Sequence, residues 1–233
     1  MQVAATAETT RCIKSAVDIL TRGIDRAGGP VNLACSFSLE DTVIIDLAQS
    51  HGLPVGIFAI DTGRLPEETY QMAELVRERY GVEIDWYFPQ ATAVQRLERE
   101  NGLFSFRNNL ESRKQCCAIR KVEPLQRALR GLAGWVTGMR REQSVTRSEL
   151  VSIEPDREHP GLLKIHPLYG WSEEELWAYA NEFRIPVHPL HRKNYPSIGC
   201  APCTRAVEPG EDIRAGRWWW ENSEHKECGL HRS

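Results

Sequence analysis

Two pairs of cysteines are the residues whose type and spacing most clearly suggest chemistry. They are Cys116-Cys117 and Cys200-Ala-Pro-Cys203, and a further cysteine, Cys228, lies in a polar stretch near the end of the chain. Thiolates bind soft metals, and two local pairs that the fold brings together can form one site with four sulfur ligands. Adjacent cysteines serve one centre only where their side chains do not point to opposite faces, which favours a helix or a turn at the first pair. Cys228 is then a spare thiol that is free to react.

Disulfide bonds and buried free thiols are the alternative interpretations of these cysteines. Disulfide frameworks belong mainly to small secreted chains, whereas this sequence shows no signal peptide and its seven cysteines are sparse for 233 residues. A metal site is therefore favoured, and its metal stays open between zinc and iron. Cys12 and Cys35 are interpreted as small apolar residues, which is the commonest role of a free cysteine.

The distribution of charge points to a small anionic ligand. The net charge is only -3, but residues 107–147 hold ten Lys or Arg against three Glu, so this block carries +7 and the rest of the chain −10. A basic block beside a cysteine pair suits a small anion or an anionic metal centre better than a nucleic acid. No apolar run approaches the ~20 residues that span a bilayer, so we expect no membrane segment and a cytoplasmic protein.

Short apolar runs that alternate with helical patterns predict the elements that position these residues. Such alternation is typical of an α/β fold with a mostly parallel sheet flanked by helices. We expect one domain over 1–233, with an N-terminal helical segment at about 1–28 and a loop-rich C-terminal extension at about 186–233. Strands are expected at 31–35, 55–60, 84–88, 135–137 and 162–165, and helices at 40–50, 66–80, 92–101, 117–129 and after a capping box at 172–175.

Three loops with anion-binding chemistry follow predicted strands, where ligands of parallel sheets are usually bound. The first, 36–41, offers hydroxyls and helix N-terminal amides to a phosphate, although the same residues could serve only as an N-cap. The second, 61–65, contains a Gly and an Arg that can meet an anion or stack on a base. The third, 137–144, holds Arg140 and Arg141, which either bind an oxyanion or pair with a neighbouring acid such as Glu142.

Seven stretches together carry a resemblance to a known family. They are Ser36-Phe-Ser38, Asp61-Thr-Gly-Arg-Leu65, Cys116-Cys117-Ala-Ile-Arg120-Lys121, Thr137-Gly138 with Arg140-Arg141-x-Gln143-Ser144, Ser197-Ile-Gly-Cys200-Ala-Pro-Cys203-Thr-Arg205, Gly216-Arg217-Trp-Trp-Trp220 and Glu227-Cys228-Gly-Leu-His231. The chain resembles the iron-sulfur branch of the assimilatory APS/PAPS reductases, from about residue 30 to its end. APS is adenylyl sulfate, and PAPS is its 3'-phosphorylated form. The first loop lacks the Gly-Gly of related ATP-cleaving enzymes, which argues against ATP hydrolysis.

The resemblance implies an adenine nucleotide α-hydrolase-like fold and a thioredoxin-dependent reduction of APS to sulfite and AMP. Thioredoxin or a glutaredoxin-like protein is the implied reductant, and Cys228 is the implied nucleophile, which forms an S-sulfocysteine. A [4Fe-4S] cluster is implied on Cys116, Cys117, Cys200 and Cys203. The implied substrate-binding residues are Ser36, Ser38, Ile60, Lys121, Gly138, Arg147, Arg214, Arg217 and His231.

Several alternatives stay open from the sequence. The substrate could be PAPS, or both nucleotides, and a non-catalytic zinc module with four cysteine ligands is a remote alternative. The resemblance is compatible with a homo-oligomer but does not define one. We expect Trp218, Trp219 and Trp220 to pack as an anchor for a tail that closes over substrate and opens to the reductant.

Overall fold

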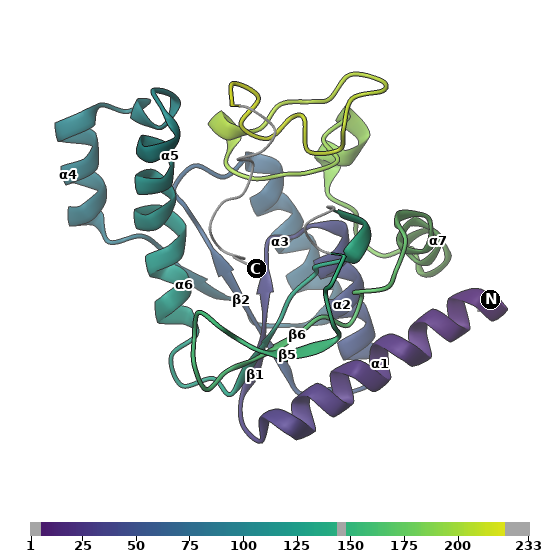
Figure 1. Cartoon of the computed structure of the whole chain (residues 1–233). Helices are drawn as coiled ribbons and strands as arrows, with labels where there is room; N and C mark the ends of the chain where they lie inside the picture. The colour runs from purple at the N-terminus through teal and green to yellow at the C-terminus, as the bar shows by residue number, and fades with distance from the viewer. Residues whose placement is uncertain (1–5, 144–147, 222–233) are drawn as a thin grey trace.

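A six-stranded sheet lies at the centre of the fold (Figure 1). The computed structural model describes residues 6–143 and 148–221. The strand order is β3-β2-β1-β4-β6-β5, in which β5 runs antiparallel to β6 and all the other pairs are parallel. The strands are β1 (Val31–Cys35), β2 (Val55–Ile60), β3 (Asp85–Tyr87), β4 (Gly134–Val136), β5 (Ile153–Pro155) and β6 (Leu163–Ile165). The expected mostly parallel α/β fold is confirmed.

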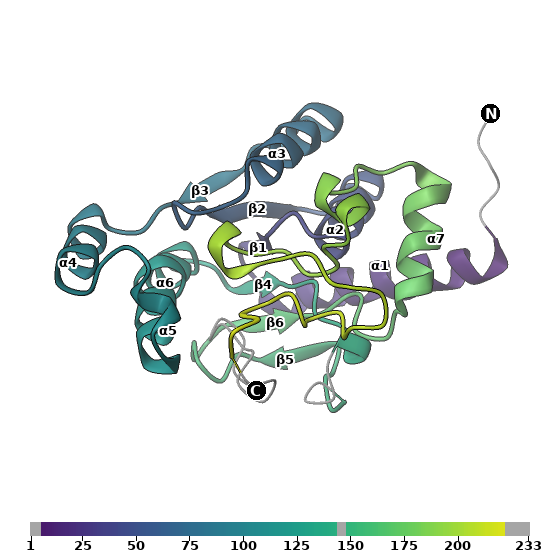
Figure 2. The ribbon, with the colours of Figure 1, turned by 90° about the horizontal axis from the view of Figure 1, so that it is seen from above.

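Helices cover both faces of this sheet (Figure 2). On one face α1, α2, α3 and α7 surround the larger core, to which Val31, Leu33 and Cys35 of β1 contribute. On the opposite face α6 packs against β2 and β3, and a smaller core forms around Phe58 and Trp135. The helices are α1 (Ala7–Ala27), α2 (Leu39–Ser50), α3 (Glu67–Tyr80), α4 (Ala91–Asn101), α5 (Leu110–Cys117), α6 (Glu123–Ala128) and α7 (Glu173–Phe183).

The helix expected at 117–129 is wrong in its extent. Helix α5 begins earlier, because the side chain of Asn109 accepts a hydrogen bond from the Ser112 amide at 2.8 Å and caps its first turn. The chain then passes through a π-helical turn, η2 (Ala118–Val122), into α6. Pro124 has no N–H to give the next regular helical bond, so a change of register immediately before it is expected.

The segment after α7 has little regular structure in its described part. Residues 186–221 contain only two short 3-10 helices, η5 (Pro189–Lys193) and η6 (Ala201–Cys203). This segment lies over the carboxyl ends of the strands (Figure 1), where the Ala201 amide donates to the Arg64 carbonyl at 2.8 Å. Elsewhere in the described residues, 3-10 helices form at η1 (Ser105–Arg107) and η3 (Arg141–Gln143). Within the described ranges, every helix is too short or too polar to cross a membrane.

Candidate functional site

The four paired cysteines line one small pocket. Cys116 and Cys117 end helix α5, while Cys200 is the N-cap and Cys203 the last residue of the short helix η6 in the C-terminal segment. All four are free thiols. No three His, Cys, Asp or Glu side chains in the described part of the chain are grouped as a single metal ion requires. The fold thus brings the two pairs to one pocket, as the cysteine spacing predicts.

Positive charge surrounds these thiols. The pocket is also lined by Arg64, Arg113, Arg120, Lys121 and Arg217. Burial alone would raise the pKa of Cys200, but a hydrogen bond from Thr62 and the charges of Lys121, Arg217 and Arg120 together outweigh burial and lower that pKa. Burial and the neighbouring Cys200 raise the pKa of Cys203 to about 12.

The chemistry of these donors fits an iron-sulfur cluster. Four unbridged cysteines are the usual ligands of a [4Fe-4S] cluster. With four thiolates an oxidised cluster is an anion, and the five cationic side chains around the pocket would balance its charge.

The loop after β2 braces the cysteine pocket. The hydroxyl of Thr62 lies 3.2 Å from the Cys200 sulfur, and the Thr62 carbonyl accepts from Arg120 at 2.7 Å. Arg64 and Arg120 both donate to Glu98, at 2.9 and 2.5 Å. Arg64 therefore lines the cysteine pocket and not the larger cavity next to it, which disfavours stacking on a nucleotide base and leaves contact with an anion as the prediction for this residue.

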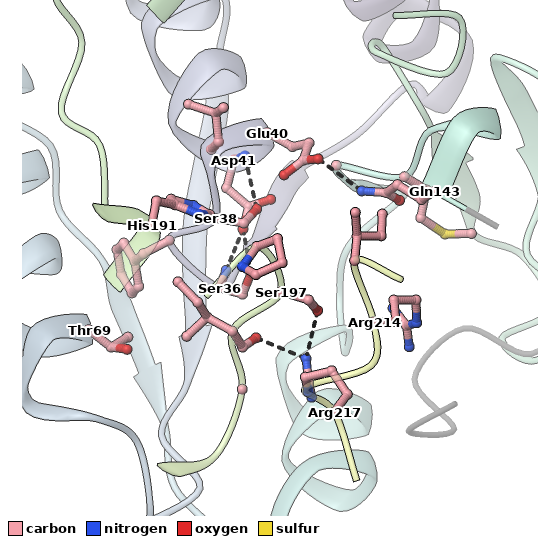
Figure 3. Close-up of a pocket in the computed structure, with 18 of the residues that line it drawn as sticks. Ser36, Ser38, Glu40, Asp41, Thr69, Gln143, His191, Ser197, Arg214 and Arg217 are labelled. Carbon is pink, nitrogen blue, oxygen red and sulfur yellow. Dashed lines mark hydrogen bonds between the residues drawn. The ribbon is translucent and has the colours of Figure 1, made fainter. Parts of the chain in front are cut away.

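A cavity of about 730 Å³ opens at the carboxyl ends of the strands (Figure 3). Apolar residues at the strand ends, including Phe58, Ile60 and Trp135, form one part of its wall. Arg214 and Arg217 lie together on another side, away from His191 and Thr69 (Figure 3). The cavity brings together seven of the expected substrate-binding residues, namely Ser36, Ser38, Ile60, Lys121, Gly138, Arg214 and Arg217.

The first loop is held by its own helix. Ser38 is the N-cap of α2, and Asp41 in the first turn accepts from the Ser36 amide at 2.6 Å and from its hydroxyl at 2.8 Å. Phe37 between the two serines has a φ of 61° and stacks on Trp86. Burial raises the pKa of Asp41 to about 6, although the hydrogen bonds from Ser36 act in the opposite direction. The loop is thus both a helix cap and a wall of the cavity.

The third loop lines the cavity mainly with its backbone, because the guanidinium groups of Arg140 and Arg141 are engaged by other residues. Arg140 is buried and donates to Glu40 at 3.1 Å and to Glu142 at 2.9 Å, as the alternative from the sequence stated. Arg141 stacks on Tyr169. Gly138 packs so closely on α2 that an added Cβ would lie 2.7 Å from the Cβ of Glu40. A side chain at position 138 would therefore displace the start of α2.

Three residues line both the cavity and the cysteine pocket: Lys121, Arg217 and Trp218. Arg217 donates to the Ser197 hydroxyl at 3.3 Å and to the Ile198 carbonyl at 3.0 Å (Figure 3). The buried Trp218 ring packs against the guanidinium groups of Arg217 and Arg113, whose central carbons lie 4.7 and 4.5 Å from its centroid. We call these three residues the shared wall.

Some site residues are outside the described ranges, and others were missed. Arg147, Cys228 and His231 lie outside the described residues. Sequence reasoning missed Arg113, which is almost fully buried beside the thiols and donates to Glu221 at 2.6 Å. Its only signal was membership of the basic block. The role of Arg120 was also missed, although it lies within the motif that holds the first cysteine pair.

Comparisons with known proteins agree on one family. A family model described as the phosphoadenosine phosphosulfate reductase domain matches residues 30–206. A Burkholderia cepacia protein named adenosine 5'-phosphosulfate reductase is 53% identical over 92% of this chain and 86% of its own length. A crystal structure of phosphoadenylyl-sulfate (PAPS) reductase from Candida auris in a phosphate complex is 25% identical, covers 89% of this chain and all of its own, and has a TM-score of 0.69. The FMN adenylyltransferase of Candida glabrata shares the fold alone, at 15% identity and a TM-score of 0.62 over 97% of this chain and 81% of its own.

Proposed function

Since the chain belongs to the phosphoadenosine phosphosulfate reductase domain family, we propose that it reduces APS to sulfite and AMP in sulfate assimilation. The observation that carries this proposal is the shared wall, where two cations face a nucleotide-sized cavity on one side and four thiols on the other. The high identity to a protein named adenosine 5'-phosphosulfate reductase favours APS as the substrate.

APS would bind to three parts of the cavity wall, namely the apolar strand ends, the backbone at Gly138 and the cationic side chains. The adenine base would lie against the apolar strand ends near Ile60, with the backbone of Gly138 at its edge. The phosphosulfate would meet Lys121, Arg214 and Arg217, because charge-assisted hydrogen bonds to its oxygens are strong. The same cations would stabilise the negative charge that develops on the leaving phosphate. Arg147 and His231 are proposed as further contacts from the family resemblance.

The first chemical step would form an S-sulfocysteine. The thiolate of Cys228 attacks the sulfur of the sulfate group, the bond from that sulfur to the bridging oxygen breaks, and AMP leaves with the electron pair. Cys228 comes seven positions after Glu221, whose carboxylate is paired with the buried Arg113.

A dithiol protein, thioredoxin or a glutaredoxin-like reductant, would complete the reaction. Its first thiolate attacks the Cys228 sulfur, and sulfite leaves with the electrons of the sulfur–sulfur bond. Its second thiol then resolves the mixed disulfide, which restores the Cys228 thiolate and oxidises the reductant. A reducing compartment such as the cytoplasm keeps both proteins' thiols available, and we propose that location.

A [4Fe-4S] cluster on Cys116, Cys117, Cys200 and Cys203 is proposed as the resident cofactor. When bound, it would supply structural support and a fixed negative charge next to the shared wall, because the two thiols of the reductant already provide both electrons. Lys121 would lie between that charge and the substrate, and would orient the phosphosulfate from the cavity side. Thr62 and Arg120 would hold the Cys200 side of the pocket.

One experiment tests the main parts of this proposal. The protein is purified anaerobically, its optical spectrum and iron content are recorded, and sulfite release from APS is measured with thioredoxin for the parent and for Cys228→Ser. We expect four irons per chain in both proteins and sulfite release from the parent alone. Sulfite release by Cys228→Ser would contradict the role of that thiol, and zinc without iron or sulfide would restore the zinc module.

PAPS is the second candidate substrate. It is supported by the likeness to the structure of the Candida auris phosphoadenylyl-sulfate (PAPS) reductase. The ratio of kcat/KM for APS to that for PAPS decides between the two nucleotides. We expect this ratio to exceed tenfold, and a ratio near one would indicate an enzyme that uses both.

A further inference from the structure

A chain of three polar side chains runs from the edge of the sheet to the wall of the cavity. Glu154 of β5 lies 3.3 Å from Nε2 of His166, and Nδ1 of the same ring lies 2.7 Å from the Thr137 hydroxyl. His166 is fully buried, Thr137 is buried and lines the cavity, and Glu154 is partly exposed. We call these three residues the relay.

The direction of each hydrogen bond in the relay follows from the chemistry of its groups. An ionised carboxylate only accepts, so Nε2 of His166 donates to Glu154. In the neutral ring Nδ1 is then an acceptor, to which the Thr137 hydroxyl donates. The hydroxyl oxygen of Thr137 keeps its lone pairs and accepts from the Met139 amide at 3.3 Å. The relay therefore ends on the turn that contains Gly138.

Close packing constrains the position of this turn. Gly138 packs against the start of α2, and an added Cβ would come within 2.9 Å of Asp41 Oδ1. The same turn directly follows β4, whose Trp135 belongs to the apolar part of the cavity wall. The bond from the Met139 amide to Thr137 and the bond between Thr137 and the buried His166 imidazole fix the turn in addition to its packing on α2.

We infer that Glu154 and His166 are positioning residues that hold the Thr137–Gly138–Met139 turn against the base of the bound nucleotide. This inference rests on the proposed function, because it takes the base to lie beside Gly138. The relay touches no reacting atom. It acts by preorganisation, so that binding does not have to order the turn.

Ligand affinity tests the relay with matched variants. Calorimetry measures the binding of AMP and of ribose 5-phosphate, which lacks the base, to the anaerobically purified protein. Without the relay, binding has to order the backbone of the turn, so we expect Thr137→Val and His166→Gln to weaken AMP binding by about tenfold. Thr137→Ser keeps the hydroxyl, and His166→Asn keeps a polar atom close to the place of Nδ1, so both should stay within about threefold of the parent. Ribose 5-phosphate affinity should change in none of them.

Each outcome decides the inference. Loss of AMP affinity in Thr137→Val and His166→Gln, with ribose 5-phosphate binding and the melting temperature retained, supports it. Equal losses for both ligands, or a lower melting temperature with AMP affinity unchanged, would show a purely structural role and overturn it. Glu154→Leu, at the exposed end, carries the same test if a buried variant fails to fold. A parent protein that does not bind AMP would instead refute the proposed function, and the relay's role with it.

Discussion

Lys121 is the residue at which we expect the loss of one charge to lower the catalytic rate most. It lines the cavity and the cysteine pocket, and it lowers the pKa of Cys200. Removal of one preorganised group that stabilises a developing charge typically costs 10²–10³ in rate. We therefore expect Lys121→Ala to lower kcat/KM for APS by about 100-fold.

The matched control for Lys121→Ala is Arg130→Ala. Arg130 belongs to the same basic block but is exposed and lines neither pocket. We expect its removal to leave kcat/KM within about twofold. Iron content must be measured for both variants, since equal losses of activity in the two would assign the effect to net charge and not to the shared wall.

Asp41 should make stability depend on pH in an unusual direction. Burial raises its pKa from an ordinary 3.8 to about 6, so the native state holds a proton that the unfolded state releases between these values. Protonation therefore favours the native state as the pH falls from about 6.5 to 4, by at most about 3 kcal/mol. We expect the free energy of unfolding of the parent, relative to Asp41→Asn, to rise over this window in urea titrations.

A carboxylate with the opposite shift provides the comparison for Asp41. Burial of Asp156 is outweighed by hydrogen bonds from His159 and from the Glu158 amide, which lower its pKa. Its contribution to stability is therefore lost as the pH falls. The free energy of unfolding of the parent, relative to that of Asp156→Asn, should therefore decrease towards acid pH. If the free energy of the parent relative to Asp41→Asn also decreased, the raised pKa of Asp41 would be contradicted.

At the scale of elements, the loop that carries the second cysteine pair also positions Arg217. Gly199 lies so close to this guanidinium group that an added Cβ would overlap its Nη2. We expect Gly199→Ala to displace Arg217 from Ser197 and Ile198, and to lower kcat/KM for APS nearly as much as Arg217→Ala. The double variant should be no worse than Arg217→Ala, since both changes remove the same interaction.

Gly170→Ala is the control for Gly199→Ala. Its added Cβ would meet no atom within 4 Å, and its backbone is not in the left-handed region. We would measure kcat/KM for APS and a melting curve for the parent, the two single variants Gly199→Ala and Arg217→Ala, their double variant and Gly170→Ala. These measurements separate the displacement of Arg217 from a general loss of stability. Additive losses in the double variant would show that Gly199 acts on something other than Arg217.

The sequence predicted the elements whose pattern is local. The strands near 31–35 and 55–60 match β1 and β2, because apolar runs bounded by turn residues define buried parallel strands. Edge strand β5 was missed, since it has three residues and pairs antiparallel through contacts that its own sequence does not encode. Helix α5 was also missed, because its residues 110–117 are mostly polar and show little apolar periodicity.

The motifs of the candidate site could be predicted from the sequence, but the side-chain interactions between those motifs could not. Cysteine spacing indicated two pairs for one site, and the fold brings both pairs to one pocket. The same sequence could not show that Arg64 pairs with Glu98, or that Arg140 pairs with Glu40, because each partner lies more than 30 positions away. The relay was not predicted either, because Glu154 belongs to the missed strand β5, while His166 and Thr137 follow two other strands, β6 and β4.

At the scale of the whole molecule, the cysteine pocket joins the sheet to the C-terminal segment. Cys200 and Cys203 belong to a stretch whose only regular structure in the described residues is 3-10 helix. Its links to the rest of the fold include the Ala201–Arg64 backbone bond and the buried Arg113–Glu221 ion pair. A cofactor held by both cysteine pairs would add a covalent link between α5 and this segment.

Removal of that cofactor should therefore loosen the molecule unevenly. After chelation of iron under air, we expect hydrogen exchange to rise at least tenfold in residues 105–122 and 189–221, while β1 and β2 stay protected by the main core. The melting temperature should fall by several degrees, since a ligand that binds only the native state stabilises it. Exchange followed by mass spectrometry, before and after iron removal, measures this directly. A uniform rise across the sheet would instead mean that the cofactor supports the entire fold, and unchanged exchange would mean that the four cysteines hold no structural metal.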